Sequence, residues 1–227
     1  MLDDSLMNYF IAFSGRTGSS WFCDLLRSTG QLGKPLEHFC LDGSGRFLPN
    51  PFWDSTTWQT HYSEYLRHTP TENGVTAAKL TWHQWSRLQV GLGGVPDVNA
   101  WIWLRRRDKL RQAISSYKNE CTLQSVLLAG ETLLPDPPCD ETRILSLALA
   151  FEDEDTLWSS YFTGRSVLEL WYEEFVDDPR PAVERVAAHL AIELRALQLS
   201  SAHRPMANAT SQQWYEQLLP KWKRLRC

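Results

Sequence analysis

Short apolar runs alternate along the chain with segments in which apolar residues recur every three or four positions. Residues 9–13 form an apolar run that has the length of a buried strand. Phe22, Leu25 and Leu26 follow at helical spacing, and Gly30 stands where a helix of that length would end. The first thirty residues therefore predict a strand, a polar loop that contains glycine, and a helix.

The same alternation continues to the end of the chain. Further strands are predicted at 75–80, 99–104 and 167–171. Further helices are predicted at 55–68, 82–90, 108–119 and 140–163, from Asp178 and Pro179 onward, and at 208–219, with Pro220 ending the last one. This order indicates an α/β fold with a mostly parallel central sheet flanked by helices. We expect residues 1–227 to form a single domain, because domains usually hold about 100–200 residues.

Composition narrows the class of protein. The 227 residues are 43% hydrophobic and 22% charged, and 23 Lys and Arg against 27 Asp and Glu give a net charge of −4. A nucleic-acid-binding protein is usually basic, so we expect no nucleic-acid partner. The five cysteines contain no CxxC pair, which indicates neither a zinc site nor a disulfide framework. The apolar runs are too short for a membrane span and the first residues do not form a secretory signal, so we expect a soluble, cytoplasmic protein.

The loop after the first strand carries the clearest chemistry. It reads Gly15-Arg16-Thr17-Gly18-Ser19-Ser20. A glycine turn that opens a helix presents unpaired backbone N–H groups and the positive end of the helix dipole. Its side chains add hydroxyl donors and one guanidinium, so the loop predicts a phosphate or sulfate cradle. A nucleoside-triphosphate P-loop would place a Lys where Ser19 stands, and a plain structural corner remains the alternative.

A basic cluster follows the strand predicted at 99–104. Ligands of open α/β folds lie at the carboxyl ends of the strands. We expect Arg107 at the strand end and Ser115 on the next helix to hold a second anion, and Arg105 and Arg106 to be solvated charges. Two anion sites at neighbouring strand ends suggest a ligand with two separated phosphate groups.

These motifs together resemble the sulfotransferases that use 3′-phosphoadenosine-5′-phosphosulfate (PAPS), and within them the bacterial trehalose-sulfotransferase family. The resemblance extends to GKPLEHF (33–39), VTAAKLTWHQW (75–85), FEDEDTLWSSYF (151–162), ELWYEEFVDDP (169–179) and HRPMANATSQQWYEQLL (203–219). It implies a P-loop-NTPase-like sulfotransferase fold and sulfuryl transfer from PAPS, with 3′-phosphoadenosine-5′-phosphate (PAP) as product and no metal. It also implies a small-molecule, glycan or glycolipid acceptor and a homodimer.

The resemblance assigns roles to the cofactor-binding residues. The loop from Gly15 to Ser20, with Trp21, would cradle the 5′-phosphosulfate, and Arg16 would stabilise the charge that develops on the leaving phosphate. Arg107 and Ser115 stand eight positions apart, as in the motif that grips the 3′-phosphate, and Arg204 would add a further contact. Many members of the superfamily have a Lys where Arg16 stands.

The resemblance also implies that Glu37 is the general base, and Lys79, Trp82 and His83 are expected to bind substrate. Many relatives instead carry a His base two positions after the strand Lys, where Thr81 stands here. His38 and His83 therefore remain alternative bases. A kinase-like nucleotide enzyme and a catalytically inactive nucleotide-binding homologue remain alternative functions.

Overall fold

The computed structural model describes residues 7–42, 44–48, 54–195 and 197–226. Its strands are β1 (Met7–Phe13), β2 (Val75–Leu80), β3 (Ala100–Arg105) and β4 (Leu168–Trp171). Its helices are α1 (Ser19–Ser28), α2 (Trp58–His68), α3 (Trp82–Leu92), α4 (Lys109–Thr122), α5 (Glu141–Phe162), α6 (Tyr172–Phe175), α7 (Arg180–His189) and α8 (Ala209–Leu225). All four predicted strands are present, to within two residues at each end.

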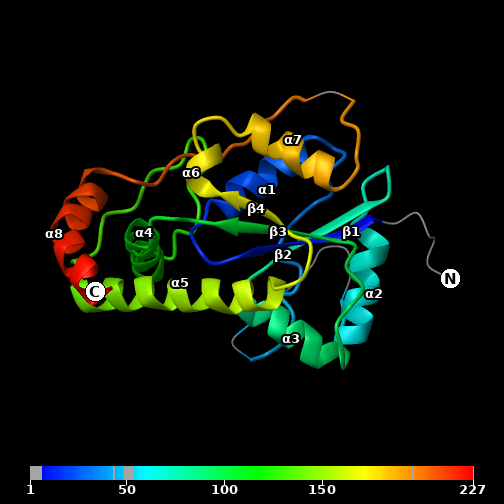
Figure 1. Ribbon diagram of the computed structural model, residues 1–227, viewed down its shortest axis with the longest axis horizontal. Coiled ribbons are helices and arrows are strands. Elements are labelled where there is room, and N and C mark those ends of the chain that lie inside the picture. The colour runs from blue at the N-terminus through cyan, green and yellow to red at the C-terminus, as the bar shows by residue number, and fades with distance from the viewer. Residues whose placement is uncertain (1–6, 43, 49–53, 196, 227) are drawn as a thin grey trace.

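The strands form one sheet in the order β2-β1-β3-β4, and every pair is parallel. Ile11 of β1 lies opposite Lys79 of β2 on one side and Ile102 of β3 on the other. Because the strands are parallel, their carboxyl ends lie at one edge, next to α4 and α8 (Figure 1). The predicted α/β class with a parallel central sheet is confirmed.

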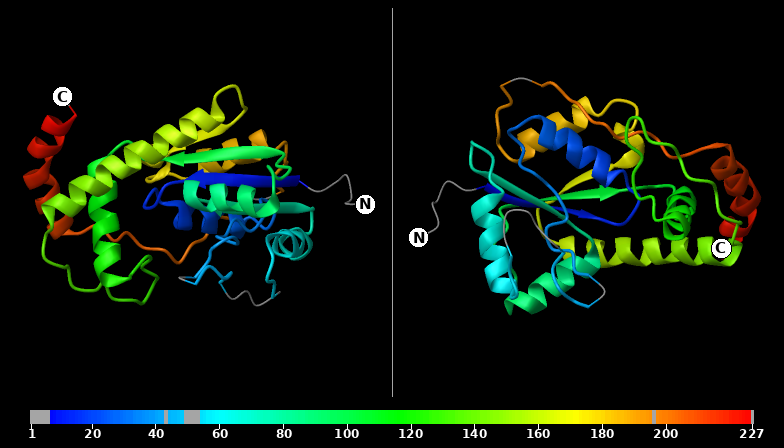
Figure 2. Two further views of the ribbon diagram at one scale, coloured as in Figure 1. Left: turned by 90° about the horizontal axis from the view of Figure 1, so that it is seen from below. Right: turned by 180° about the vertical axis from the view of Figure 1, so that it is seen from behind.

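Strand alternation divides the core between the two faces of the sheet. Tyr9, Ile11 and Phe13 pack with α1, α6 and α7, whereas Phe10 and Ala12 pack with α2, α3 and α5. The helices cover both faces of the sheet in Figures 1 and 2. A third apolar cluster joins α4, α5 and α8 beyond the carboxyl ends of the strands. This third cluster supports the edge of the sheet at which ligands bind in such folds.

Several helix boundaries differ from the sequence-based expectation: α2 begins three residues late, at Trp58, and α4 ends three residues late, at Thr122. Helix α7 begins at Arg180, one residue late, because Pro179 takes the N-cap place and Asp178 accepts the backbone N–H of Arg180 at 3.1 Å. Helix α8 does not end at Pro220 but continues to Leu225. Its last turns bury Trp222 in the third cluster, and that burial offsets the hydrogen bond that proline removes. The four-residue α6 was not predicted.

No helix in the described ranges is both long enough and apolar enough to cross a lipid bilayer.

Candidate functional site

The loop between β1 and α1 has the strand–loop–helix geometry that the predicted cradle requires. Gly18 is the N-cap of α1, and its φ of 75° is one that glycine adopts without strain. A Cβ atom on Gly18 would stand 2.8 Å from the ring of Tyr172, so the position also lacks space for a side chain. The first bond of the helix joins the N–H of Phe22 to the carbonyl of Gly18, and the first turn contains no acidic residue. The N–H groups before Phe22 and the positive end of α1 are therefore available to an anion.

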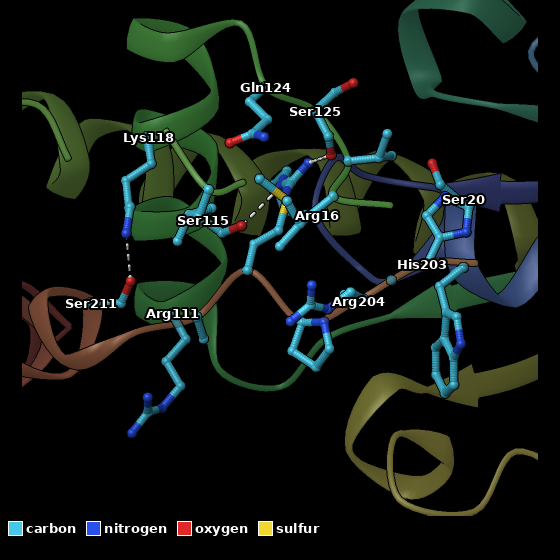
Figure 3. A pocket seen from close by; sticks show the side chains of 18 of the residues that line it. Arg16, Ser20, Arg111, Ser115, Lys118, Gln124, Ser125, His203, Arg204 and Ser211 are labelled. Carbon is cyan, nitrogen blue, oxygen red and sulfur yellow. Dashed lines mark hydrogen bonds between the residues drawn. The ribbon is translucent and has the colours of Figure 1, made fainter. Parts of the chain in front are cut away.

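A cavity of about 460 Å³ opens on this helix end. Its walls come from α1, α4, α6, the segment 122–134 and the segment 203–211 (Figure 3). Seven of the predicted cofactor-binding residues line it: Arg16, Gly18, Ser19, Ser20, Trp21, Ser115 and Arg204. The structure thus gathers residues from both ends of the chain around one space.

Arg16 extends across this cavity. Its Nε donates to Ser115 Oγ at 2.9 Å, and its terminal nitrogens donate to the carbonyl of Ser125 and to Met206 Sδ (Figure 3). Burial and the neighbouring Arg106 guanidinium both lower the pKa of Arg16. Each of these hydrogen-bond acceptors is neutral, so the charge of Arg16 is not compensated by them.

Arg106 is the second guanidinium of the cavity, and it is half-buried. Its Nη1 donates to the carbonyl of Arg16 at 3.0 Å, its guanidinium lies 4.5 Å from the centre of the Tyr172 ring, and its Nε has no partner. Burial lowers the pKa of Arg106, although Tyr172, Glu173 and Asp108 oppose the shift. Among the described residues, no carboxylate lies within ion-pairing distance of Arg106 or Arg16. Two half-buried guanidiniums that form no ion pair with a described carboxylate are the strongest indication of an anion site.

The structure places the strand-end arginines differently from the sequence-based expectation. Arg107 does not line the cavity; its side chain pairs with Glu174 and lies over the ring of Trp171. Arg105 is not a free solvated charge either, since it pairs with Asp155 and Glu169 and is 20% exposed. Side chains alternate between the two faces of the sheet along β3. Trp101 and Trp103 pack on the face that α5 covers, where Arg105 lies over the Trp103 ring, whereas Ile102 and Leu104 pack on the face that α1 covers. Ser115 therefore shares the cavity with Arg106 and not with Arg107.

Gly15 and Thr17 support the loop on the side away from the cavity. The carbonyl of Gly15 accepts a hydrogen bond from Gln112 Nε2 at 2.6 Å, and the buried Thr17 hydroxyl donates to the carbonyl of Ser14 at 3.1 Å. Neither residue lines the cavity. Their contacts fix the backbone that carries Arg16 and Gly18.

Glu37 lies at the edge of the cradle. Its Oε1 pairs with Lys79 Nζ at 2.9 Å, and the same Nζ donates to Ser20 Oγ at 2.9 Å. Partial burial favours the neutral acid, but Lys79, Gln84 and Cys40 hold the pKa of Glu37 below its ordinary value. The side chain is 38% exposed, so the carboxylate is both ionised at neutral pH and accessible. Lys79 is buried and connects this carboxylate to the cavity through Ser20.

The other predicted acceptor residues stand beside Glu37 in the first turn of α3. Trp82 is half-buried against Trp158, with ring centres 5.0 Å apart, and its backbone N–H donates to Glu154 Oε1 at 3.0 Å. Burial raises the pKa of Glu154 to about 7. His83 is exposed, and neither Trp82 nor His83 lines the cavity.

The remaining aromatic and histidine candidates have identifiable neighbours. Trp21 lines the cavity and stacks on Phe175, with ring centres 5.9 Å apart. The ring of His38 faces the carbonyl of Lys34 at 3.1 Å, and burial lowers its pKa to about 4.

Sequence reasoning missed several cavity residues. Arg106 had a usable signal, because it follows Ile102 and Leu104 at intervals of two and so belongs to the face that α1 covers. The segment 122–134 had none, since loops that meet only in three dimensions follow no local period, whereas the resemblance had already pointed to the segment 203–211 through Arg204. Hydrogen bonding between Arg204 N and the carbonyl of Leu127 joins the two segments.

Comparison with known proteins places these features in a family. The family model described as Stf0 sulphotransferase matches residues 8–219. A sulfotransferase domain from the olefin synthase of Synechococcus PCC 7002 matches at 11% sequence identity and a TM-score of 0.46, over 94% of this chain and 85% of that chain. The search of curated proteins found no match.

Proposed function

Because the chain belongs to the Stf0 sulphotransferase family, we propose that it transfers a sulfuryl group from PAPS to a hydroxyl group of a carbohydrate or glycolipid-type acceptor. The observation that carries this proposal is the pair of half-buried guanidiniums in the cavity, Arg16 and Arg106, which form no ion pair in the described part of the chain. Such a pair fits a ligand that carries more than one anionic group.

The cavity residues fit PAPS in two places. The N-terminus of α1, with the hydroxyl groups of Ser19 and Ser20, would hold the 5′-phosphosulfate. Arg106 and Ser115 would hold the 3′-phosphate, with Arg106 in the role that sequence spacing gave to Arg107. A volume of about 460 Å³ is within the usual range of small-molecule sites.

The purine base requires an apolar surface as well. Trp21 and the apolar side chains of Val126 and Leu127 line the same cavity. Arg204, which is exposed on the opposite wall, is available to the outer phosphate oxygens. These contacts support a nucleotide and not a bare sulfate as the ligand.

Bound PAPS supplies an activated sulfuryl group for in-line displacement. Negative charge develops on the phosphate that leaves, and Arg16 together with the N–H groups of the cradle would stabilise it. Lys79, which touches Ser20, would place a second cation at the edge where the sulfuryl group is transferred. Glu37 would accept the proton of the acceptor hydroxyl at a carboxylate oxygen. Trp82 and His83, in the adjacent turn of α3, would contact the acceptor.

A nucleotide titration tests the donor assignment. PAP at about 100 times its dissociation constant should add about 2.7 kcal/mol to the free energy of unfolding, whereas ATP and ADP at equal concentration should add much less. Calorimetry and thermal denaturation measure both effects. Tighter binding of ATP than of PAP, or binding of neither, would refute PAPS as the donor.

A transfer assay tests the reaction and the base. Incubation with [35S]PAPS and a panel of mono- and disaccharides, with trehalose among them, should give a labelled sugar. Glu37→Gln should abolish transfer and leave PAP affinity unchanged. Full transfer by this variant would remove Glu37 from the mechanism, and PAP binding without transfer to any acceptor would support an inactive homologue.

A further inference from the structure

Gln84 connects the start of α3 to the carboxylate of Glu37. Its backbone N–H donates to Thr81 Oγ1 at 3.3 Å, and its side-chain Oε1 accepts the backbone N–H of Thr81 at 2.8 Å. This reciprocal pair is a capping box, which fixes the first turn of the helix. The other end of the same amide, Nε2, donates to Glu37 Oε2 at 3.1 Å and to Cys40 Sγ at 2.8 Å.

The capping box determines which way the amide of Gln84 points. If the amide were turned over, its NH₂ group would face the N–H of Thr81 and its oxygen would face the Glu37 carboxylate. Both hydrogen bonds would then be lost, because two donors would face each other at Thr81 and two acceptors would face each other at Glu37. The helix cap therefore presents the NH₂ group to Glu37 in one orientation.

Glu37 is held at both of its oxygens. Oε1 pairs with Lys79, whose ammonium is a point charge with three rotatable donors and imposes little direction. Oε2 accepts from the planar amide of Gln84 and from the thiol of Cys40 at 3.3 Å. Burial and Glu37 raise the pKa of Cys40 to about 12, so the thiol remains a protonated donor. The planar amide, which is rigidly attached to a helix, is thus the contact that sets the plane of the carboxylate.

We propose that Gln84 is a positioning residue that orients the Glu37 carboxylate toward the acceptor hydroxyl. This inference rests on the proposed role of Glu37 as base. Gln84 touches neither the cavity nor the reacting atoms, and it acts through Glu37 alone. Because Nε2 donates to the ionised carboxylate, it also favours the form of Glu37 that accepts a proton.

The test variant is Gln84→Glu. A glutamate at this position of the helix retains an oxygen for the N–H of Thr81, so the capping box survives. Its second oxygen has no hydrogen to donate and faces the Glu37 carboxylate. We expect PAP affinity within twofold of wild type and a fall in kcat of about 10- to 100-fold at pH 7, the loss expected for a hydrogen bond to a charged group.

The pH dependence separates positioning from a structural role. Loss of the donor raises the pKa of Glu37, so the acid limb of the kcat profile should move to higher pH by at least about one unit. The carboxyl ¹³C resonance of Glu37, assigned by comparison with Glu37→Gln, should move with it. This titration requires no acceptor; the kcat measurement uses [35S]PAPS and trehalose.

Three matched variants control the comparison. Gln89→Glu adds the same charge one and a half turns further along α3 and should leave kcat and the acid limb unchanged. Thr81→Ala weakens the cap and should lower the midpoint of thermal unfolding without moving the limb. Gln84→Met removes the donor without adding charge, so if Gln84→Glu does not fold, a smaller shift in the same direction is expected from this variant.

The outcomes are distinct. A wild-type acid limb and a wild-type ¹³C titration in folded Gln84→Glu or Gln84→Met would overturn the role of Gln84, while an inactive Glu37→Gln would preserve Glu37 as base. Full turnover by Glu37→Gln would overturn both. If the acid limb moves equally in Gln84→Glu and Gln89→Glu, the shift comes from the added negative charge and not from the lost hydrogen bond. That result would also overturn the inference.

Discussion

Adjacent arginines at the end of β3 give the sharpest test of the site, because one faces the cavity and its neighbour does not. Arg106→Met replaces a half-buried guanidinium with an uncharged side chain of similar length. Arg107→Met makes the same change one residue later, where the side chain pairs with Glu174 outside the cavity. The two variants have the same amino-acid composition. They differ only in whether the altered side chain lines the cavity.

The expected magnitudes follow from the contacts. A charge-assisted hydrogen bond contributes about 1.5–3 kcal/mol, so Arg106→Met should weaken PAP binding by about 10- to 150-fold. Arg107→Met removes an exposed ion pair, which is worth at most about 1 kcal/mol to stability, and should change PAP affinity by less than about twofold.

Stability should move differently from affinity. In the free protein Arg106 contributes one hydrogen bond to the carbonyl of Arg16 and a contact with the Tyr172 ring, but it is a half-buried charge beside a second half-buried charge, Arg16. Removing it relieves that repulsion and the loss of hydration. The free energy of unfolding of Arg106→Met should therefore stay within about 1 kcal/mol of wild type or rise.

Isothermal calorimetry with PAP and urea denaturation without ligand measure the two quantities. If Arg107→Met loses PAP affinity and Arg106→Met keeps it, the geometry of the cavity does not represent the nucleotide site. If Arg106→Met loses several kcal/mol of stability, Arg106 is a structural residue and the argument from uncompensated charge fails.

Two further predictions address the cradle and the wall beside it. Gly18→Ala should lower the midpoint of thermal unfolding and weaken PAP binding at least tenfold. The reason is that a Cβ would meet the Tyr172 ring at 2.8 Å and that a φ of 75° is strained for alanine. Wild-type PAP affinity in a folded Gly18→Ala variant would contradict this prediction. Burial raises the pKa of Glu154 to about 7, so the folded state binds more protons than the unfolded state between about pH 4.5 and 7, and wild-type stability should fall as pH rises through that window. Glu154→Gln can still accept the N–H of Trp82 and should remove this decline. The thermal midpoints of the variant and the wild type should therefore differ at pH 8 and agree at pH 5. Equal midpoints at both pH values would refute the raised pKa of Glu154.

Local patterns were enough to predict the parallel sheet and the cradle. The strand at 9–13 is apolar throughout because helices cover both of its faces. The loop that follows requires only a turn and a helix start, which Gly15 and Gly18 indicate. Asp108 and Asn208 were predictable as helix N-caps for the same local reason, and each accepts a backbone N–H of its own helix.

What could not be predicted depends on contacts between distant segments. Pro220 reads locally as a stop, but the apolar cluster that holds Trp222 lies across α4 and α5. The motif spacing pointed to Arg107, whereas in the structure Arg106, one residue past the end of β3, reaches the carbonyl of Arg16 and Arg107 lies over the ring of Trp171. A spacing rule compares sequences along one dimension and does not record the side of the sheet on which a side chain stands.

The contact between Arg16 and Met206 spans 190 residues, which has a consequence for the growing chain. At about 5–20 residues per second, the ribosome adds the segment that carries Met206 roughly 10–40 seconds after Arg16. During that interval the wall that residues 203–211 contribute to the cavity is missing, and Arg16 has no contact with Met206. The cavity is therefore complete only after residues 203–211 have been synthesised and have met the loop that carries Arg16.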